Sequence, residues 1–354
     1  MKKKFLISTG GSGGHVIPAI ILYEHLSKER SVILTTDKRG LNFFDKSYYH
    51  YEIIDTPKLN NIFFLPFCLI KISYLIIKSI LLFRKNSITK IFSTGGYMSI
   101  PLILAAKLCN LKIYLIEPNH VLGRANKFFL SFCEKIFCYS PKLKNFPKRF
   151  TNKIIDIDPL VKKEIYELKS SKEEKRKFTV LVVGGSQGAN IFDKNLKRII
   201  VNISKNIPIK IIQQTKKQNL SLLNDYYFNN SVEKKIFTFE RNFVNLIQQS
   251  DICITRGGAS SLAELSLMNL PFIAVPLPAS KDNHQFENAN FYKENDCCWL
   301  IEQKYFEEKI EDLLRKIITN KDEYMKKKEN LRKLNYQNSW NNVNQKILGT
   351  INEN

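Results

Sequence analysis

The same local pattern occurs in both halves of this 354-residue chain: an apolar run, then a glycine-rich turn, then a segment with helical character. Residues 5–8 lead into the turn 9–15, and residues 179–183 lead into the turn 184–189. Short apolar runs that alternate with helices predict α/β layers built on parallel strands. Open parallel sheets bind ligands at the carboxyl ends of their strands, which is where these turns fall. The pattern therefore predicts a doubly wound fold with an anion site in each half.

The second half repeats the pattern in a fuller form. Residues 251–255 predict a strand, Arg256-Gly257-Gly258 a turn, and residues 259–268 a helix. The first N–H groups of such a helix lack partners, and an anion there gains on the order of 0.3–1 kcal/mol from the helix dipole. Glu264 has two interpretations: it accepts hydrogen bonds from sugar hydroxyls, or it forms a capping box with Ser261. The spacing alone does not separate them.

The first half carries two glycine-rich turns, at residues 9–15 and 94–99. The first of them has four glycines in five positions and precedes a helix expected at residues 18–26, an arrangement typical of phosphate binding. It matches neither a Walker A sequence nor G-x-G-x-x-G, because Val16 stands where the third glycine belongs. A nucleotide hydrolase or a dinucleotide-binding protein is therefore disfavoured. His15 ends the turn and is a candidate functional residue; the alternative is an exposed or capping histidine.

The net charge of the chain is +22, from 55 basic and 33 acidic side chains. Such an excess indicates an anionic partner, although lysine is also abundant as a matter of composition. No nucleic-acid module is recognisable, so a phosphorylated substrate or an acidic membrane is favoured over nucleic acid. The seven cysteines include no C-x-x-C pair and indicate reduced thiols of a cytosolic protein. The apolar run at the start is too short for a signal peptide.

Residues 62–83 are the most hydrophobic part of the chain and approach the length of a membrane span. Lys71 and Lys78 argue against spanning, since a central lysine costs roughly 2.5–3.5 kcal/mol on insertion scales. On a helix these two lysines and Lys85 lie along one stripe, with Arg84 near its end. The segment is therefore interpreted as a helix lying in a membrane interface. The alternative is an ordinary domain helix with one solvated stripe.

The length of the chain favours two domains over one core. A lysine-rich region poor in apolar runs, residues 141–177, contains the predicted linker. The resulting plan has an N-terminal Rossmann-like domain at 1–160, a linker at 161–178, a second Rossmann-like domain at 179–335 and a helical tail at 336–354. Two such domains facing across a cleft present two anion sites to each other. This predicts a reaction between two phosphorylated molecules.

Together, the motifs resemble those of the MurG family, the peptidoglycan N-acetylglucosaminyltransferases, in family order from residue 5 to about residue 290. The resemblance implies a GT-B fold and transfer of N-acetylglucosamine from UDP-N-acetylglucosamine to lipid I, undecaprenyl-diphospho-N-acetylmuramoyl-pentapeptide, giving lipid II with inversion at the anomeric centre. The motifs are residues 9–15, Gly95-Gly96-Tyr97, Glu117-Pro118-Asn119, Gly123, Asn126-Lys127, residues 184–189, Arg256-Gly257-Gly258-Ala259, Glu264, His284-Gln285 and Asn288-Ala289.

The resemblance also implies roles for single residues. His15 is implied as the general base or as a contact of the acceptor diphosphate, with Glu117 as the next candidate base. Glu264 is implied to bind the ribose hydroxyls, which favours that interpretation over the capping box. Substrate contacts are implied for Ser12, Gly13, Gly14, Asn119 and Asn126 in the first half, and for Ser186, Gln187, Ala259, Ser260, Ser261, Leu262, Ala263, Gln285 and Asn288 in the second.

This chain departs from the family pattern at three places, one of which is a slightly longer loop before His284. Ile116 and Pro118 stand where the family has His and Gln, and Val161 stands where a donor-contacting Arg is usual. Lys162 or Lys163 is a candidate to supply the missing charge. These departures affect the expected donor contacts more than the expected reaction.

The resemblance implies UDP-N-acetylglucosamine, lipid I, an anionic membrane surface and cell-wall synthesis proteins as partners, and no nucleic acid. The expected location is peripheral, on the cytoplasmic face of the inner membrane. No D-x-D-like cluster lies at a glycine turn, so we expect no metal site and no cofactor. Two alternatives remain: a glycosyltransferase acting on another lipid such as diacylglycerol, and a non-catalytic nucleotide-sugar-binding membrane scaffold.

Overall fold

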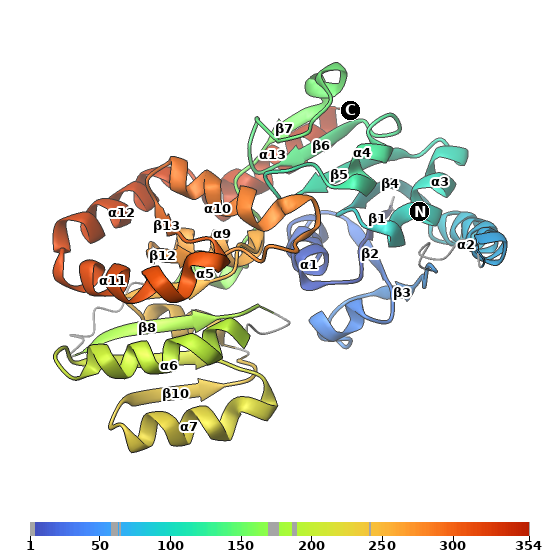
Figure 1. Ribbon diagram of the computed structural model, residues 1–354. Coiled ribbons are helices and arrows are strands. Elements are labelled where there is room, and N and C mark those ends of the chain that lie inside the picture. The colour runs from blue at the N-terminus through green and yellow to red at the C-terminus, as the bar shows by residue number, and fades with distance from the viewer. Residues whose placement is uncertain are drawn as a thin grey trace. The chain divides into compact units, whose positions relative to one another are not determined.

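The computed structural model describes residues 4–57, 63, 65–168, 177–185, 190–240 and 242–353. The chain forms two compact units, one of Met1–Lys162 with Ser339–Asn354 and the other of Lys163–Asn338. In the described residues, each unit is built on a parallel sheet flanked by helices (Figure 1). The last helix of the chain, predicted only as a tail, belongs to the first unit.

The first unit contains a seven-stranded sheet in the order β3-β2-β1-β4-β5-β6-β7, and each pair of neighbouring strands is parallel. Its central strands form because their runs of Ile, Leu and Phe are buried on both sides, as in sheets covered on both faces. The strands are β1 (Lys4–Ser8), β2 (Ser31–Thr36), β3 (Tyr51–Ile53), β4 (Ile88–Ser93), β5 (Lys112–Glu117), β6 (Lys135–Cys138) and β7 (Ile154–Asp156).

Alternate residues of this sheet enter different cores. Leu6, Ile91 and Ile113 pack with α2, α3 and α4 on one face. The other face carries a row of aromatic rings across four strands, with neighbouring centroids 5.2–6.2 Å apart. These rings are Phe5, Phe92, Tyr114 and Phe137. The helices of the unit are α1 (Gly13–Ser27), α2 (Leu65–Asn86), α3 (Ile100–Leu108), α4 (Arg124–Phe129) and α13 (Trp340–Glu353).

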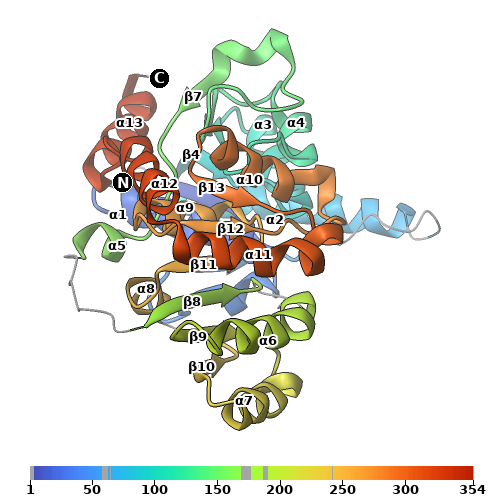
Figure 2. The ribbon, with the colours of Figure 1, turned by 60° about the vertical axis from the view of Figure 1, so that its left-hand side comes forward.

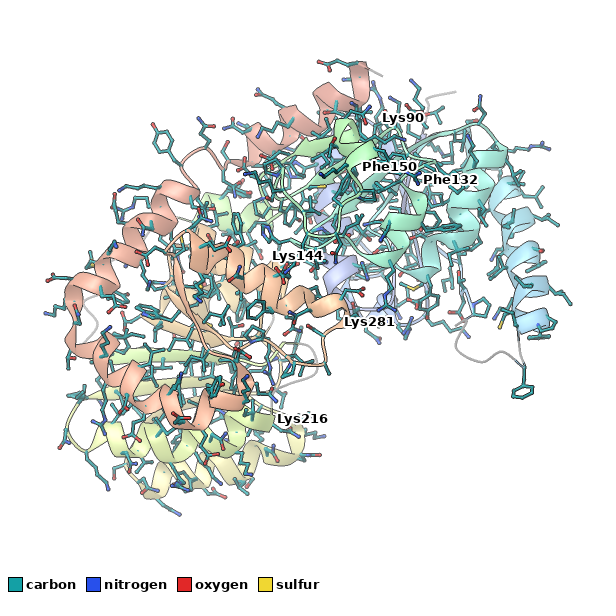
Figure 3. The ribbon with its side chains drawn as sticks, turned by 45° about the horizontal axis from the view of Figure 1, so that its top comes forward. Lys90, Phe132, Lys144, Phe150, Lys216 and Lys281 are labelled. Carbon is teal, nitrogen blue, oxygen red and sulfur yellow. The ribbon has the colours of Figure 1, made fainter. Side chains whose placement is uncertain are left out.

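Helix α13 is fixed to the first unit by three polar or aromatic contacts. The ring of His25 in α1 stacks on Trp340, with centroids 3.6 Å apart. Its Nδ1 donates to Oδ1 of Asn344 at 3.2 Å. At the far end of α13, the ammonium group of Lys90 donates to the carbonyl of Ile351, on the aromatic face of the sheet (Figure 3).

The second unit contains a six-stranded parallel sheet in the order β10-β9-β8-β11-β12-β13 (Figure 2). In β8, Val180 and Val182 face a core shared with α6, α7 and α11, whereas Leu181 and Val183 face a core shared with α8, α9, α10 and α12. The strands are β8 (Phe178–Val183), β9 (Ile209–Gln214), β10 (Glu233–Phe237), β11 (Ile252–Thr255), β12 (Phe272–Ala274) and β13 (Cys298–Leu300). The helices are α5 (Lys163–Glu167), α6 (Asn190–Ser204), α7 (Leu220–Asn229), α8 (Phe243–Gln248), α9 (Ala259–Leu267), α10 (His284–Glu294), α11 (Phe306–Thr319) and α12 (Lys321–Leu334).

Both sheets reverse their strand order next to the first strand of the unit. The reversal falls between β1 and β4 in the first unit and between β8 and β11 in the second. Glycine-containing turns follow these four strands in the described residues, at 9–12, 94–96, 184–185 and 256–258. Parallel α/β sheets bind ligands at such reversals. The predicted doubly wound α/β fold is therefore confirmed for each unit.

Candidate functional site

The turn after β1 passes into helix earlier than predicted. Helix α1 begins at Gly13, with Ser12 as its N-cap, so Gly13, Gly14 and His15 form its first turn. The prediction of a start at residue 18 was wrong, because glycine's low helix propensity of about 1 kcal/mol per residue is outweighed here by the packed remainder of the helix. A Cβ at Gly14 would meet no atom closer than Ser12 Oγ at 3.8 Å. The protein interior does not require a glycine there, so its backbone is open to a ligand.

His15 is oriented by the neighbouring strand. Its Nδ1 lies 2.8 Å from the carbonyl oxygen of Thr94, which can only accept a hydrogen bond. Nδ1 therefore carries the proton in the neutral ring, and Nε2 is the basic nitrogen. A Cβ at Gly96 would lie 3.7 Å from that Nε2. The second glycine turn thus leaves space beside the basic edge of the ring, as a general base needs.

A charged cluster that the sequence did not indicate lies beside these turns. Asp37 is 2% exposed and accepts hydrogen bonds from the N–H groups of Gly11 at 2.8 Å and Gly40 at 2.9 Å. Arg39 donates to it through Nε at 2.9 Å and Nη2 at 2.8 Å, and Nη2 also donates to the hydroxyl of Tyr97. Burial alone would raise the pKa of Asp37, but these hydrogen bonds outweigh it and hold the pKa below its usual range.

Glu117 is the anchor of the loop that follows β5. Its carboxylate is 2% exposed and accepts hydrogen bonds from the backbone and side chain of Asn119, from the N–H of Gly123 and from the side chain of Asn126, at 2.8–3.2 Å. A carboxylate engaged in this way holds a loop together. The contacts favour an anchoring role for Glu117 over its role as an alternative base.

The same contacts place Asn119 and Asn126 within one network. Asn126 is buried and also donates to the carbonyl of Ile116 at 3.0 Å. Its Oδ1 has no hydrogen-bond partner among the described residues and lies 3.1 Å from where a Cβ at Gly95 would stand. Asn126 therefore packs beneath the second glycine turn, and its predicted contact with substrate stays a prediction.

In the second unit, the start of α9 decides between the two interpretations of Glu264. The N-cap of α9 is Gly258, and no side chain caps the helix. Ser261 is therefore inside the helix, so Ser261 and Glu264 do not form a capping box. Glu264 lies in the second turn and is half-buried, as are Ser260 and Ser261. These side chains remain in place for a ligand at the helix start.

Leu262 and Ala263 also lie in α9, but on its inner side. Both are at most 2% exposed, and Leu262 belongs to the core shared with β8 and β12. The helical period of 3.6 residues directs them inward while Ser260, Ser261 and Glu264 stay near the surface. The side chains of Leu262 and Ala263 therefore pack inward, which leaves only their backbone groups for a ligand, and the predicted substrate contacts of these two residues stay a prediction. Ala259 at the helix start is half-buried.

Gln285 and Asn288 hold the turn before α9. A Cβ at Gly257 would come within 2.0 Å of the Gln285 carbonyl oxygen, so only glycine fits there. Asn288 donates to the Gly257 carbonyl at 3.0 Å, and Gln285 Oε1 accepts from the N–H of Leu277 at 2.9 Å. A Cβ at Gly258 would meet nothing closer than Ser261 Oγ at 4.0 Å. As with the glycine at position 14, this backbone is open to a ligand.

Arg256 of the glycine turn has a structural position. It donates through Nη1 to the carbonyl of Val275 at 2.9 Å, and its guanidinium lies 5.2 Å from the centroid of the Phe192 ring. Burial lowers the pKa of this group. Arg256 thus joins the ends of β11 and β12 rather than standing open at the surface.

The predicted contacts Ser186 and Gln187 lie outside the described residues. Helix α6, which follows them in the chain, is held by a polar network that sequence reasoning missed. Asp193 in the first turn of α6 is 8% exposed and accepts hydrogen bonds from Gln213, Thr215 and Asn219 at 2.7–2.9 Å. These partners come from β9 and the residues that follow it. No pattern in the sequence joins them, because they are twenty or more positions from Asp193.

The position where the family pattern has an arginine is part of a core. Val161 is 1% exposed. Lys163, one of the two candidates for the missing charge, forms an ion pair with Glu167 in α5. The candidate role of Lys162 or Lys163 toward the donor therefore stays a prediction. Among the described residues, no group of three or more His, Cys, Asp or Glu side chains is arranged to hold a metal ion.

Helix α2 presents an apolar face outward. Its inner face, with Leu75 and Phe83, packs in the core with α3, while its outer face leaves large side chains 60–69% exposed. Of the described helices, α2 is the one long and apolar enough to cross a membrane by length and composition, with a mean hydropathy of 1.9 in its most apolar window. The exposed side chains are Phe67, Ile70, Tyr74, Ile77 and Leu81.

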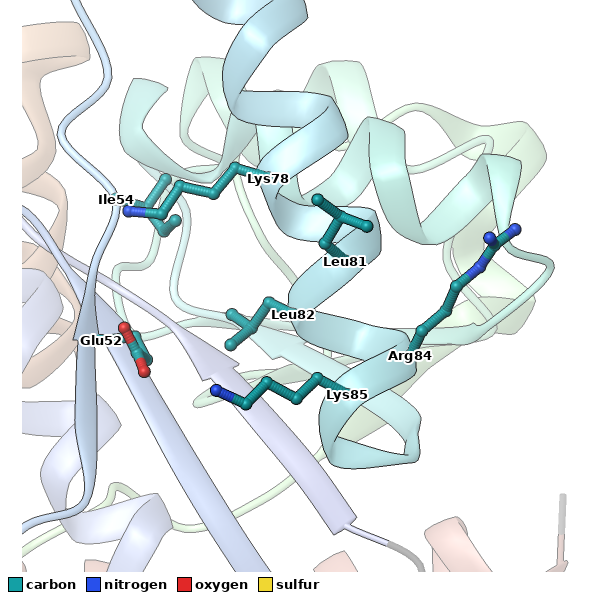
Figure 4. A pocket seen from close by; sticks show the side chains of 7 residues that line it. All are labelled: Glu52, Ile54, Lys78, Leu81, Leu82, Arg84 and Lys85. Atoms are coloured by element: carbon teal, nitrogen blue, oxygen red, sulfur yellow. The ribbon is translucent and has the colours of Figure 1, made fainter.

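A pocket of about 480 Å³ lies between α2 and the strand β3 at the sheet edge (Figure 4). Lys78 and Lys85 extend from α2 toward this strand, and Lys78 donates to the carbonyl of Ile53 at 3.2 Å. Arg84 extends away from it. Lys78 and Lys85 thus lie on the same side of α2, as the predicted lysine stripe has them, and their contact with a membrane stays a prediction. The lining residues are Glu52, Ile54, Lys78, Leu81, Leu82, Arg84 and Lys85.

Solved structures show the same fold over the whole chain. The structure of MurG from Acinetobacter baumannii matches with a TM-score of 0.77 at 19% identity, covering 100% of both chains. A UDP-glucosyltransferase from Polygonum tinctorium matches with a TM-score of 0.73 at 10% identity, covering 100% of this chain and 98% of the other. Together with the glycine turns at both strand reversals, these likenesses define the class: a glycosyltransferase fold of the GT-B type.

Sequence comparison gives the family. Residues 5–138 match the glycosyltransferase family 28 N-terminal domain, and residues 179–341 match its C-terminal domain. A UDP-N-acetylglucosamine–N-acetylmuramyl-(pentapeptide) pyrophosphoryl-undecaprenol N-acetylglucosamine transferase of Pelagibacter ubique is 48% identical over 100% of both chains. The one of Rickettsia canadensis is 32% identical over 90% of this chain and 91% of its own. The chain belongs to glycosyltransferase family 28 and, within it, to the MurG family, which confirms the resemblance of the motifs.

Proposed function

We propose that this protein transfers N-acetylglucosamine from UDP-N-acetylglucosamine to lipid I, the N-acetylmuramyl-(pentapeptide) pyrophosphoryl-undecaprenol named in its relatives, to form lipid II for peptidoglycan. The observation that carries the proposal is the 48% identity over the full length of a transferase with this activity. The starts of α1 and α9, which follow glycine turns beside the strand reversal of each unit, support the proposal, because a helix N-terminus can bind a phosphorylated ligand.

The second unit supplies the donor contacts in this proposal. The start of α9, with its open backbone at Gly258, binds a phosphate of UDP, and Ser260 and Ser261 lie in the same first turn. Glu264 one turn further accepts hydrogen bonds from the ribose hydroxyls. The partial positive charge of a helix start stabilises the UDP as negative charge develops on it. This stabilisation needs no metal ion, and we propose that the reaction uses none.

The first unit supplies the base. The ring of His15 is held by Thr94 through Nδ1, and its Nε2 accepts the proton of the 4-hydroxyl of the muramic residue. The hydroxyl oxygen forms its bond to the anomeric carbon as the bond from that carbon to the UDP oxygen breaks, and the electron pair leaves with UDP. General base catalysis of this kind contributes typically 10²–10⁴-fold to the rate.

The decisive experiment is transfer of labelled N-acetylglucosamine from UDP to a lipid I analogue by the purified protein. We expect product with the lipid I analogue, none with diacylglycerol, and an unchanged rate in the presence of EDTA. Product with diacylglycerol alone would identify a transferase with another lipid acceptor. Binding of UDP without transfer to either acceptor would favour a non-catalytic scaffold.

We propose further that α2 docks the first unit on the cytoplasmic face of the inner membrane without crossing it. A lipid-linked acceptor leaves the bilayer only at a cost of about 0.8 kcal/mol per CH₂, so the enzyme has to work at the surface. The inner face of α2 is part of a protein core, which a spanning helix would have to leave. Its exposed apolar side chains enter the interface, while Lys71, Lys78, Lys85 and Arg84 lie beside anionic head groups.

A further inference from the structure

Arg39 occupies the point where three loops of the first unit meet. It follows β2, and the sheet order places β2 next to β1 and β1 next to β4. The residues after these three strands therefore emerge at one edge of the sheet. One consequence is that Arg39 contacts groups far from it in sequence, including Tyr97 on the second glycine turn. Nothing in the reaction described above uses this arginine.

The contacts of Arg39 fix its guanidinium but do not use all of it. Nε and Nη2 donate to Asp37, and Nη2 also contacts Tyr97. The planar group lies 5.6 Å from the centroid of the Tyr97 ring. Nη1 has no hydrogen-bond partner among the described residues, and the side chain remains 46% exposed. A guanidinium that is held in place with two N–H donors left over is prepared to bind an oxyanion.

The surroundings of Arg39 connect it to the base. A Cβ at Gly11 would lie 3.5 Å from Arg39 Nη2 and 2.9 Å from Met98 Cε. A Cβ at Gly96 would lie 2.9 Å from the same methyl group and 3.7 Å from His15 Nε2. The arginine and the histidine thus border the same two glycine turns on either side of Met98. When a substrate places a hydroxyl beside His15, charged groups close to that hydroxyl lie near the two glycine turns.

We infer that Arg39 binds the pyrophosphate of the acceptor and gives the first unit its selectivity for a phosphorylated acceptor. The inference rests on the proposed function, because the acceptor of the relatives carries a pyrophosphate between its sugar and its lipid. Asp37 and Tyr97 hold the guanidinium, and Nη1 together with the open N–H groups at the start of α1 receives the phosphate oxygens. The ion pair with Asp37 positions the arginine, and the N–H groups of Gly11 and Gly40 stabilise part of the charge of that carboxylate.

The test measures binding of a short-chain prenyl pyrophosphate and of the corresponding prenyl alcohol by calorimetry, so it does not depend on transfer. Loss of a charged hydrogen bond predicts that Arg39→Gln weakens binding of the pyrophosphate about 10- to 100-fold and leaves binding of the alcohol unchanged. Arg39→Lys keeps the charge but not the paired N–H donors of the guanidinium. Its affinity for the pyrophosphate should therefore lie between those of the wild type and Arg39→Gln. The matched control is Lys38→Gln, an exposed neighbour with the same change of charge, which should bind as the wild type does.

Kinetics with the lipid I analogue give the second readout. Arg39→Gln should raise the acceptor KM about tenfold or more while the KM for UDP-N-acetylglucosamine changes less than about twofold. Equal weakening by Arg39→Gln and Lys38→Gln, or unchanged pyrophosphate binding in a folded Arg39→Gln protein, overturns the inference. Absence of transfer by the wild type with intact pyrophosphate binding would instead contradict the proposed function and leave the arginine site standing. If Arg39→Gln does not fold, the same two measurements, pyrophosphate affinity and acceptor KM, are made on Arg39→Lys, and unchanged values overturn the inference.

Discussion

Single residues around the glycine turns are oriented mainly by backbone groups. His15 is held by a carbonyl, Asp37 by two N–H groups, and Glu117 by N–H groups of the loop it anchors. Backbone partners move little when a side chain is replaced, so the effect of a substitution at such a position belongs mostly to the substituted group itself. In the variants that follow, an effect on activity can therefore be distinguished from a general loss of structure.

We expect Glu264→Ala to weaken donor binding with little change in stability. The residue lies in the second turn of a helix that no side chain caps, so its removal costs no cap. Losing hydrogen bonds to a charged group costs roughly 1.5–3 kcal/mol, or about a 10- to 150-fold rise in the KM for UDP-N-acetylglucosamine. Steady-state kinetics and a melting curve measure the two effects. A lower melting temperature with an unchanged KM would mean that Glu264 is structural.

His15→Ala should reduce kcat by at least about a hundredfold, the low end of general base catalysis. The reason is the tautomer imposed by the Thr94 carbonyl, which leaves Nε2 as the basic nitrogen. Turnover at saturating donor and acceptor is the measurement. Near-normal turnover of His15→Ala would remove His15 as the base.

Glu117→Gln should destabilise the protein. An amide keeps one acceptor oxygen but turns its own N–H groups toward the N–H donors of Asn119, Gly123 or Asn126. An unsatisfied buried donor costs about 1–3 kcal/mol, which urea unfolding detects. The opposite result, wild-type stability with a hundredfold lower kcat, would show that Glu117 is the base after all.

At this scale the sequence named part of the candidate site. His15 and Glu264 could be named because each follows a glycine turn at a recognisable distance, and their roles stay predictions. Asp37 and Arg39 were missed because Asp-Lys-Arg after a strand is an ordinary polar turn, and their partners Gly11 and Tyr97 are brought to them only by the strand order. Leu262 and Ala263 point inward because of the residue at which α9 starts. The sequence does not define that residue, since a run of Gly, Ala and Ser is compatible with several helix starts.

At the scale of elements, the buried strands were predictable, and the two edge strands of the first unit were not. The runs of β1, β5, β8 and β11 are apolar and continuous, as strands buried on both faces require. The edge strands β3 and β7 each span three residues, none of them buried, so no apolar run marks them. Their place in the sheet comes from pairing with a neighbour, which a local pattern does not contain.

Helix α13 gives an element-scale prediction about pH. Burial lowers the pKa of His25 from 6.5 to about 4. Between these values the unfolded chain binds the proton and the folded chain does not, so this contribution to stability is complete above pH 6.5 and is lost as the pH falls toward 4. The shift in pKa corresponds to on the order of 3 kcal/mol in the free energy of unfolding. Trp340 and Asn344 are the partners that protonation would disturb.

Urea unfolding at pH 7 and pH 4.5 measures this dependence. We expect His25→Gln to show a clearly smaller loss of stability between the two pH values than the wild type does. The matched control is His50→Gln, which changes an exposed histidine of the same unit and should retain the wild-type dependence. Equal pH dependence in all three proteins would exclude His25 as its source.

At the scale of the whole molecule, the exposed apolar face of α2 leads to a prediction about membrane attachment. We expect Lys71, Lys78 and Lys85 changed together to Glu to release the protein from anionic vesicles, since each basic residue near such a surface contributes about 1 kcal/mol. Soluble acceptor analogues should still be used. Co-sedimentation at low and high salt is the measurement, and the wild type should be released as salt rises.

The control for this experiment changes Lys205, Lys216 and Lys217, which are exposed in the second unit, to Glu. The net charge is then the same, and we expect vesicle binding to persist. Release by both triple variants would make the attraction a matter of net charge alone. Extraction of the wild type only by detergent, with no effect of high salt or alkaline carbonate, would show that α2 is integral.

Helix α13 belongs to the first unit but follows the second unit in the sequence, and this has a consequence for synthesis on the ribosome. The contacts that α13 makes with His25 in α1 and with Lys90 in β4 cannot all form until Ile351 has been made. At about 5–20 residues per second, synthesis of the intervening unit takes on the order of 10–40 s. During that time the residues that α13 will contact stay uncovered, so the first unit cannot complete its packing. The second unit is thus, in the order of synthesis, an insertion between two parts of the first unit.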